Sequence, residues 1–141
     1  MPDGGWSAVE IVAEVAGGPN GAALGPDSAL YLCNNGGCFS WIEHGDLLFP
    51  GPLPGSWLGG SIDRLDLSTG AAPIIKTATT GQGEVIGLRE PNDLVFDAHG
   101  GVWFTDHGTR SDRSTDRTGI YYARLGDERA QEVVFPVDSP S

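Results

Sequence analysis

The fold is decided by the stretch at residues 18–36, GPNGAALGPDSALYLCNNG, because its pattern returns at residues 90–108 as EPNDLVFDAHGGVWFTDHG. The two stretches align without a gap at a spacing of 72 residues. Each contains Pro-Asn, three apolar residues, a five-residue turn, three apolar residues and then, after one more residue, Asn or Asp. A supersecondary unit repeated at a long period indicates a repeat architecture.

Each copy predicts two short strands, because its apolar triplets flank a turn that contains Gly and Asp. Two further strand-like runs follow each copy, at residues 61–67 and 73–77 after the first and at residues 119–125 and 131–135 after the second. Four strands make one propeller blade. The expected fold class is therefore all-β, a β-propeller fragment of about two to two and a half four-stranded blades.

The blade boundaries follow from the repeat. We expect one partial propeller over residues 1–141, in which residues 1–17 end a preceding blade, residues 18–89 form the first blade and residues 90–141 form a second blade, truncated at the start of the next. A propeller closes with about four to eight blades, so we expect a fragment of a longer parent. Its open sheet edges predict self-association or aggregation.

The composition favours a turn-rich β protein and excludes several functions. With 22 Gly and 10 Pro among 141 residues, long helices are not expected. A formal net charge of −11 repels phosphate backbones, which argues against nucleic-acid binding. No apolar run approaches membrane-spanning length, and the first residues lack the features of a secretory signal. We expect a cytoplasmic protein without a membrane partner.

The cysteines and the longest loop each leave two interpretations open. Cys33 and Cys38 flank a four-residue turn, a spacing that allows a local disulfide, although two buried reduced thiols are favoured for a cytoplasmic protein. The pair alone is too small a ligand set for zinc. Residues 44–60 form a Pro-rich loop that contains Trp57, and this loop is either a lid over a propeller mouth or a packed surface excursion.

Asn20 and Asn92 occupy the same place in the two copies, just before an apolar strand. In a propeller the innermost strand of each blade lines the channel, so equivalent side chains of successive blades converge on one axis. Amide and carboxylate oxygens gathered there suit a hard divalent cation such as calcium, which takes six to eight oxygen ligands. We predict that Asn20 and Asn92 bind a metal or a substrate. The alternative is that Pro-Asn only sets the turn into the strand.

Two acidic residues are predicted to support this site. Asp93 follows Asn92 directly, and Asp106 ends a strand at the place that Asn34 takes in the first copy, which favours a structural role. Asp97 is interpreted as a hairpin turn residue.

The remaining polar residues show no catalytic pattern. His99 and His107 are expected to be exposed beside turns, and Arg110 and Arg113 are expected in a solvated loop, with contact to an anionic or polyhydroxylated substrate as the alternative for the arginines. There is no Gly-x-Ser-x-Gly elbow, His-Glu-x-x-His pair or phosphate loop. No catalytic residue is predicted.

Taken together, these motifs resemble the senescence-marker-protein/gluconolactonase/LRE-like family over most of the chain. The run PNDLVFDAHGGVWFTD at residues 91–106 carries the resemblance most specifically. The resemblance implies a six-bladed propeller with one divalent cation in its channel, calcium first and zinc or another metal as alternatives. It also implies hydrolysis of sugar lactones or related esters.

Of the residues that hold the cation in this family, only the asparagine has a match in this chain. Its cation is typically held by a Glu of an early Glu-Gly-Pro motif, an Asn at the start of a blade and an Asp of a later Pro-Asp-Gly motif. Asn92 matches that Asn and Asn20 matches it more weakly, but the two acidic motifs are absent. We therefore expect the isolated chain to be incomplete and inactive, and its parent to be a lactonase. The alternatives are a non-catalytic propeller that presents its rim to a partner protein and a phosphotriesterase-type hydrolase.

Overall fold

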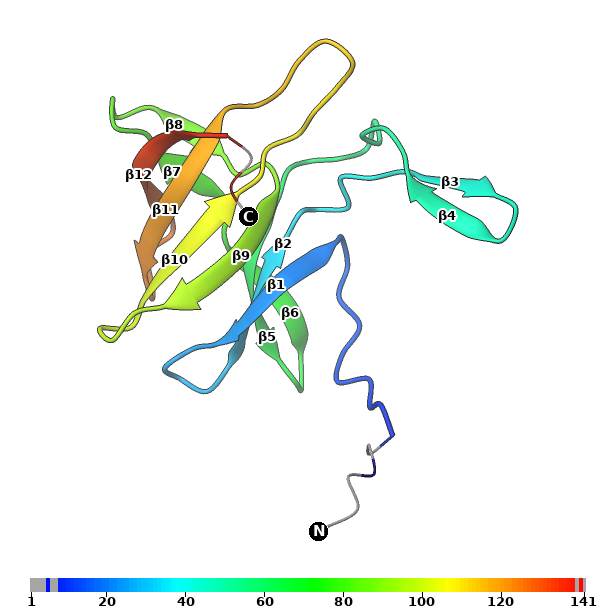
Figure 1. Ribbon diagram of the computed structural model, residues 1–141. Helices are drawn as coiled ribbons and strands as arrows, with labels where there is room; N and C mark the ends of the chain where they lie inside the picture. Colours follow the sequence, from blue (N-terminus) through cyan, green and yellow to red (C-terminus); the bar gives the residue numbers. More distant parts are fainter. Residues whose placement is uncertain (1–4, 6–7, 139, 141) are drawn as a thin grey trace.

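The structure is a computed structural model that describes residues 5, 8–138 and 140 (Figure 1). It is all-β: about 50% of the chain is strand, and the described residues contain no helix and therefore none that could cross a membrane. The strands are β1 (Pro19–Leu24), β2 (Leu30–Asn34), β3 (Trp41–His44), β4 (Leu47–Pro50), β5 (Ser61–Asp66), β6 (Gly70–Ile75), β7 (Thr77–Thr79), β8 (Val85–Gly87), β9 (Pro91–Phe96), β10 (Gly101–Asp106), β11 (Thr118–Arg124) and β12 (Ala130–Val137).

Two antiparallel four-stranded meanders correspond to the two copies of the repeat. The first unit is the sheet β1-β2-β5-β6. The second unit is β9-β10-β11-β12, and β7 extends it by pairing in parallel with β12, so that the whole sheet runs β8-β7-β12-β11-β10-β9. Four strands per repeat were predicted, and the structure confirms this number, whereas the added β7–β8 hairpin was not predicted. Over the part of the chain that the structure describes, both sheets remain open.

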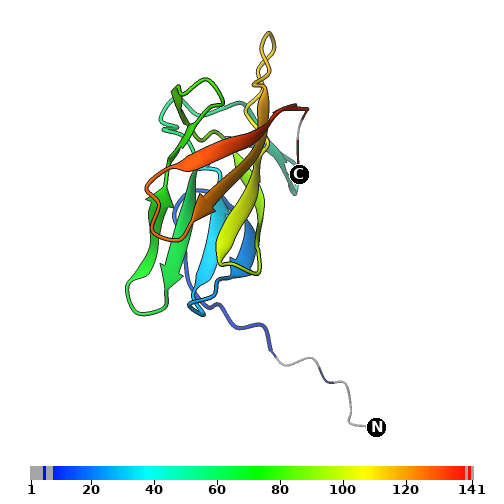
Figure 2. The ribbon, with the colours of Figure 1, turned by 90° about the vertical axis from the view of Figure 1, so that its left-hand side faces the viewer.

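The core lies between the facing surfaces of the two units, which are seen side by side in Figures 1 and 2. Tyr31 packs edge-on against Phe96 with ring centroids 5.0 Å apart, and Phe104 stacks on Tyr121 within the second unit. Because β1 also lies next to β9, the first strands of the two units are neighbours. The buried side chains of this core are Tyr31, Cys33, Ile62, Ile75, Ala78, Leu88, Leu94, Val102, Phe104, Tyr121, Ala123 and Ala130.

Of two local predictions, the one for residues 1–17 stays a prediction and the one for residues 44–60 is wrong. Residues 1–17 were expected to end a preceding blade; residues 1–4 and 6–7 lie outside the described part, and residues 8–17 contain no strand. Val9 and Ile11 are largely exposed there because no neighbouring strand pairs with them. The segment 44–60 was expected to be a loop throughout, but it contains β4, which pairs with β3 to form a hairpin that projects from the molecule. The two strands of this hairpin are too short for an alternation of polar and apolar residues to be recognised in the sequence.

Candidate functional site

The two equivalent asparagines lie together at the junction of the units. Asn20 lies in β1 and Asn92 in β9, and the Asn20 Nδ2 donates a hydrogen bond of 2.5 Å to the Asn92 Oδ1. Asn92 is half-buried and Asn20 is exposed. The structure therefore brings together the two residues that the repeat paired, although they are far apart in the chain.

A glycine allows the backbones of β1 and β9 to approach this closely. A Cβ atom on Gly21 would lie 2.6 Å from the Asn92 carbonyl oxygen and 2.5 Å from the Asp93 Oδ1. Such contacts are too short for any side chain, so Gly21 is required where the strands cross. Asp93 is exposed and its carboxylate accepts a hydrogen bond from the Leu94 N–H, which places one carboxylate beside the asparagine pair.

Asp106 holds the start of β9 in place. Its carboxylate accepts hydrogen bonds from the backbone N–H groups of Arg89 (2.7 Å), Glu90 (2.8 Å) and Gly108 (2.9 Å). Only 1% of Asp106 is exposed, and this burial raises the pKa of its carboxyl although the three N–H donors oppose the rise. Asp106 therefore anchors the backbone that leads into Asn92 and does not reach the surface itself.

Asn34 plays the equivalent part in the first unit. Its Oδ1 accepts hydrogen bonds from the backbone N–H groups of Gly18 (3.0 Å) and Gly36 (2.9 Å). These two glycines are the repeat counterparts of Glu90 and Gly108. The repeat thus extends to individual hydrogen bonds.

The amide of Asn34 also makes contacts that a carboxylate could not make. Its Nδ2 donates to the Ala16 carbonyl oxygen and to the Asp63 Oδ2, both at 2.8 Å. Asn34 and Asp63 are both buried, and the Asp63 carboxylate also accepts a hydrogen bond from the Ser61 hydroxyl, so the polar atoms of this buried pair are satisfied.

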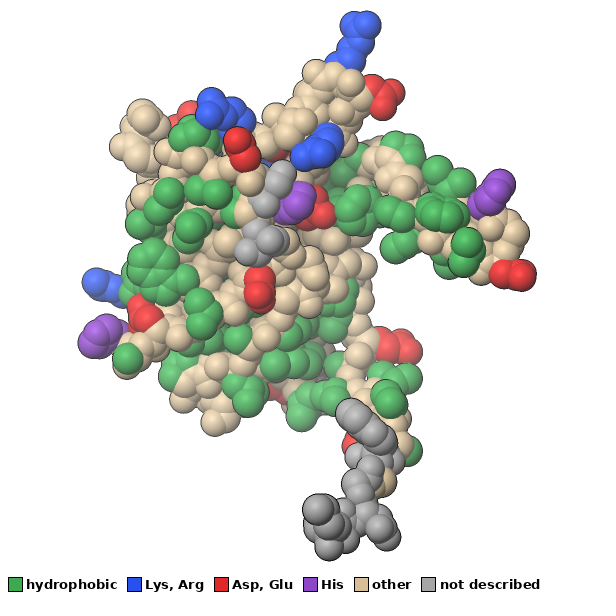
Figure 3. Space-filling view, in the orientation of Figure 1, with side chains coloured by type: hydrophobic (Ala, Val, Ile, Leu, Met, Phe, Trp, Pro, Cys, Tyr) green, Lys and Arg blue, Asp and Glu red, His purple; other side chains and the backbone are tan. Residues whose placement is uncertain are grey.

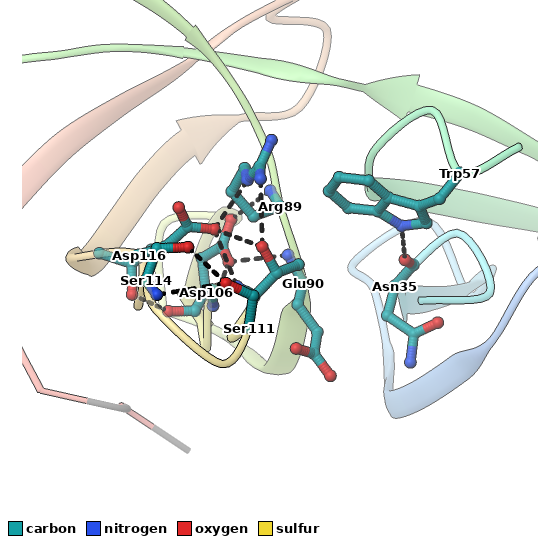
Figure 4. A network of polar contacts seen from close by, with 11 residues as sticks. Asn35, Trp57, Arg89, Glu90, Asp106, Ser111, Ser114 and Asp116 are labelled. Atoms are coloured by element: carbon teal, nitrogen blue, oxygen red, sulfur yellow. Dashed lines mark hydrogen bonds and ion pairs between the residues drawn. The ribbon is translucent and has the colours of Figure 1, made fainter. Parts of the chain in front are cut away.

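A polar cluster around Arg89 ties the two units together (Figure 4). The Arg89 guanidinium donates to the Asp116 carboxylate at 2.8 Å and lies 4.7 Å from the centre of the Trp57 ring. Trp57 donates in turn to the Asn35 carbonyl oxygen at 2.8 Å. Burial opposes the shift, but hydrogen bonds from Thr109 and Arg89 hold the pKa of Asp116 below its ordinary value. Trp57 is therefore packed against Arg89, a contact that both interpretations of its loop allow.

A cavity of about 230 Å³ lies between the segments that follow β2 and β10. Glu90, on its wall, stands two residues before Asn92, which along a strand is about 7 Å. The cavity is therefore next to the strand end that carries the asparagine pair. Ten residues line it: Cys38, Phe39, Gly51, Leu53, Glu90, His107, Gly108, Thr109, Arg110 and Thr115.

The cavity contains a carboxylate with a thiol as its partner. The Cys38 Sγ donates to the Glu90 Oε1 at 3.2 Å. Burial, and then the neighbouring Glu90 carboxylate, raise the pKa of the Cys38 thiol to about 12. Cys38 therefore stays protonated near neutral pH and is no nucleophile. Both Cys33 and Cys38 are free and buried, as predicted for reduced thiols.

The asparagine pair supplies only part of a cation site. Within the described residues no group of three or more His, Cys, Asp or Glu side chains is arranged to hold a metal ion. Two neutral amides and the Asp93 carboxylate offer fewer oxygens than the six to eight that calcium takes. Moreover, the Asn92 oxygen already accepts the hydrogen bond from Asn20. The residues present thus fit one side of a cation site and do not complete it.

The turn residues of the second copy lie away from this site. Asp97 is the turn residue that was predicted, because it accepts hydrogen bonds from the backbone N–H groups of His99 and Gly101. His99 and Arg113 are exposed, as expected.

One histidine prediction is wrong. His107 was expected to be exposed, but it is half-buried and lines the cavity together with Arg110. Its backbone N–H donates to the Glu90 carbonyl oxygen at 2.9 Å, which draws the residue toward the start of β9.

Sequence reasoning missed Glu90 and the thiol that contacts it. Glu90 is aligned with Gly18 in the other copy, so the repeat offered no signal for a side chain there. Comparison with known proteins adds nothing to this picture: no protein-family model matches the chain, and no curated protein matches it.

Proposed function

We propose that the two units are neighbouring blades of a β-propeller and that the chain carries part of the site of a cation-dependent hydrolase of sugar lactones or related esters. The observation that carries this proposal is the contact between Asn20 and Asn92, equivalent residues whose amides meet at 2.5 Å. In a propeller such a meeting point lies on the central channel. Calcium is the proposed cation, with zinc or another divalent metal as alternatives.

A cation bound there would polarise the carbonyl group of the substrate. The chain's own residues would bind the cation or the substrate and transfer the proton. Asn20 and Asn92 would offer amide oxygens to the cation or hydrogen bonds to substrate oxygens, and the Glu90 carboxylate would take a proton from the attacking water. The water oxygen bonds to the lactone carbonyl carbon, the ring C–O bond breaks, and the proton passes to the leaving oxygen. The cavity of about 230 Å³ beside Glu90 suits a small substrate.

Cation binding and hydrolysis test the proposal on the whole 141-residue chain. We expect Asn92→Asp to strengthen calcium binding, because it adds a carboxylate, and Asn92→Ala to weaken it and to lower any lactone hydrolysis by at least about tenfold. Gln82→Ala removes an amide from the exposed β7–β8 turn and is the matched control. Calorimetric calcium titration and a pH-stat assay with gluconolactone are the measurements. Equal calcium affinity in the native chain and all three variants would remove Asn92 from the site.

The projecting hairpin favours a second candidate function, a non-catalytic scaffold that presents its rim to a partner protein. Its side chains Trp41, Ile42, Leu47, Leu48 and Phe49 are 47–63% exposed, and they make the arm at the right of Figure 3 largely hydrophobic. Exposed apolar patches of this kind mark interaction sites. Turnover of gluconolactone by the folded chain in the presence of calcium or zinc would count against the scaffold. Phosphotriester turnover alone supports the third alternative.

A further inference from the structure

Each unit leaves one face of its sheet uncovered, and the strand registers show which residues lie on it. Residues directly opposite one another in antiparallel strands share a face. In the second unit Val95 pairs with Trp103 and Trp103 with Tyr122, while Thr105 pairs with Ile120 and Ile120 with Val134. We call this set face A; its members Val95 and Val134 are 61% and 43% exposed. A groove of about 230 Å³ lined by Val95, Trp103 and Ile120 crosses it.

Face A repeats the face that the first unit buries. Of the six counterparts in the first unit, four belong to the core, Ala23 packs against it, and Arg64, the counterpart of Tyr122, forms an ion pair with Asp27. The second unit thus presents to solvent a surface of the kind that its neighbour uses to dock. According to the 72-residue spacing and the matching strand registers, the counterparts of Val95, Trp103, Thr105, Ile120 and Val134 are Ala23, Tyr31, Cys33, Ile62 and Ile75.

The first unit exposes the complementary surface, which we call face B. It comprises Ala22, Leu24, Leu30 and Leu32, which face the same way because Ala22 pairs with Leu32, and Leu24 with Leu30. Of these, Leu30 is half-buried and Leu32 is buried. Leu24 is 71% exposed. The counterparts of Ala22, Leu24 and Leu30 are Leu94, Phe96 and Val102, the residues by which the second unit receives the first.

We propose that face A of one copy of this chain docks onto face B of a second copy, head to tail, just as the first unit docks onto the second within one chain. The contact of Tyr31 with Phe96 at 5.0 Å then has its counterpart between Trp103 of one copy and Leu24 of the other. Such an interface is heterologous, so it closes into a ring or grows into an open chain of copies. Docking needs only the two sheet faces and is independent of any hydrolysis.

Single-face variants test this arrangement directly. Val95→Glu blocks face A and Leu24→Glu blocks face B, and both side chains are exposed, so neither charge enters the core. Association is measured by sedimentation velocity over a range of protein concentration, at physiological and at raised salt. We expect the native chain to associate, and each variant to associate at least about tenfold more weakly. Leu67→Glu, in the exposed turn after β5, is the control and is expected to associate as the native chain does.

Mixing the two variants gives the decisive result. The Leu24→Glu chain keeps face A and the Val95→Glu chain keeps face B, so an equimolar mixture is expected to form a complex of two chains that grows no further. Far-UV circular dichroism checks the fold, and Ala22→Glu replaces Leu24→Glu if the latter is unfolded. A native chain that stays monomeric, a mixture of folded variants without a complex, or association lost only in Leu48→Glu on the β3–β4 hairpin would overturn the proposal.

Discussion

The two units share one backbone plan but differ in the polar residue that they bury at its centre. The first unit has Asn34, whose amide accepts two backbone N–H bonds and donates two of its own. The second has Asp106, whose carboxylate accepts three N–H bonds. Asn34 meets acceptors at Ala16 and Asp63, whereas the three partners of the Asp106 carboxylate are all donors. The surrounding donors and acceptors therefore decide whether the repeat position carries an amide or a carboxylate.

A glycine follows each of these residues two positions later, with the same backbone conformation but a different amount of free space. Gly36 and Gly108 both have a φ of +72°. A Cβ on Gly36 would lie 2.0 Å from the Gly59 carbonyl oxygen, while a Cβ on Gly108 would lie 2.8 Å from the Asp116 Cβ. The first unit is therefore the tighter of the two at this point, because the segment before β5 crosses over it.

The largest expected effect is a difference in stability between alanine variants of these two glycines. Both Gly36→Ala and Gly108→Ala force an L side chain into the left-handed region, which costs about 1–2 kcal/mol. Gly36→Ala adds a clash with backbone, and we expect a loss of about 4 kcal/mol in the free energy of unfolding against about 2 kcal/mol for Gly108→Ala. Urea unfolding measures both. Equal losses would show that residues 59–60 move aside freely and that the units are equally tight.

A smaller effect is expected when the polar residue of the second unit is placed in the first. Asn34→Asp removes the donors to Ala16 and Asp63 and sets a second buried carboxylate beside Asp63. We expect a loss of about 3 kcal/mol in the free energy of unfolding. The double variant with Asp63→Asn restores a donor to the pair, and urea unfolding should show recovery of part of the loss. Additive losses in the double variant would contradict a direct contact between the two side chains.

Repetition was the part of the fold that the sequence could predict. Two aligned stretches located eight strands in two units of four, and the spacing paired Asn20 with Asn92, which the structure joins by a hydrogen bond. Apolar triplets on either side of a turn mark the first two strands of each unit. A repeat pattern does not predict segments that are present in one copy alone, however, and so the β7–β8 and β3–β4 hairpins were missed.

The candidate site could be predicted only where both copies carry the same residue type. Glu90 and Cys38 meet because the segment after β2 turns back toward the start of β9, a tertiary contact that no local pattern encodes. The burial of His107 has the same origin, since its backbone N–H is tied to the Glu90 carbonyl oxygen.

The smallest expected effect is the reverse exchange, Asp106→Asn, and it depends on pH. The new amide turns a donor toward the Arg89 N–H, which costs about 2 kcal/mol near pH 4. Burial raises the pKa of Asp106 in the folded state, so the folded protein binds this proton more tightly than the unfolded chain. The stability that Asp106 contributes is thus complete below its unfolded pKa and is lost as the pH rises through the folded pKa.

The stability that the native chain gains from Asp106 over an asparagine is therefore expected to decrease as the pH rises. In urea unfolding, the difference between the native chain and Asp106→Asn should narrow from about pH 4 to about pH 8. Asp112→Asn, in the exposed loop before β11, is the control and should change little at either pH. A difference that widens with pH would mean that the three N–H donors outweigh burial, and Asp106 would then be held as a carboxylate.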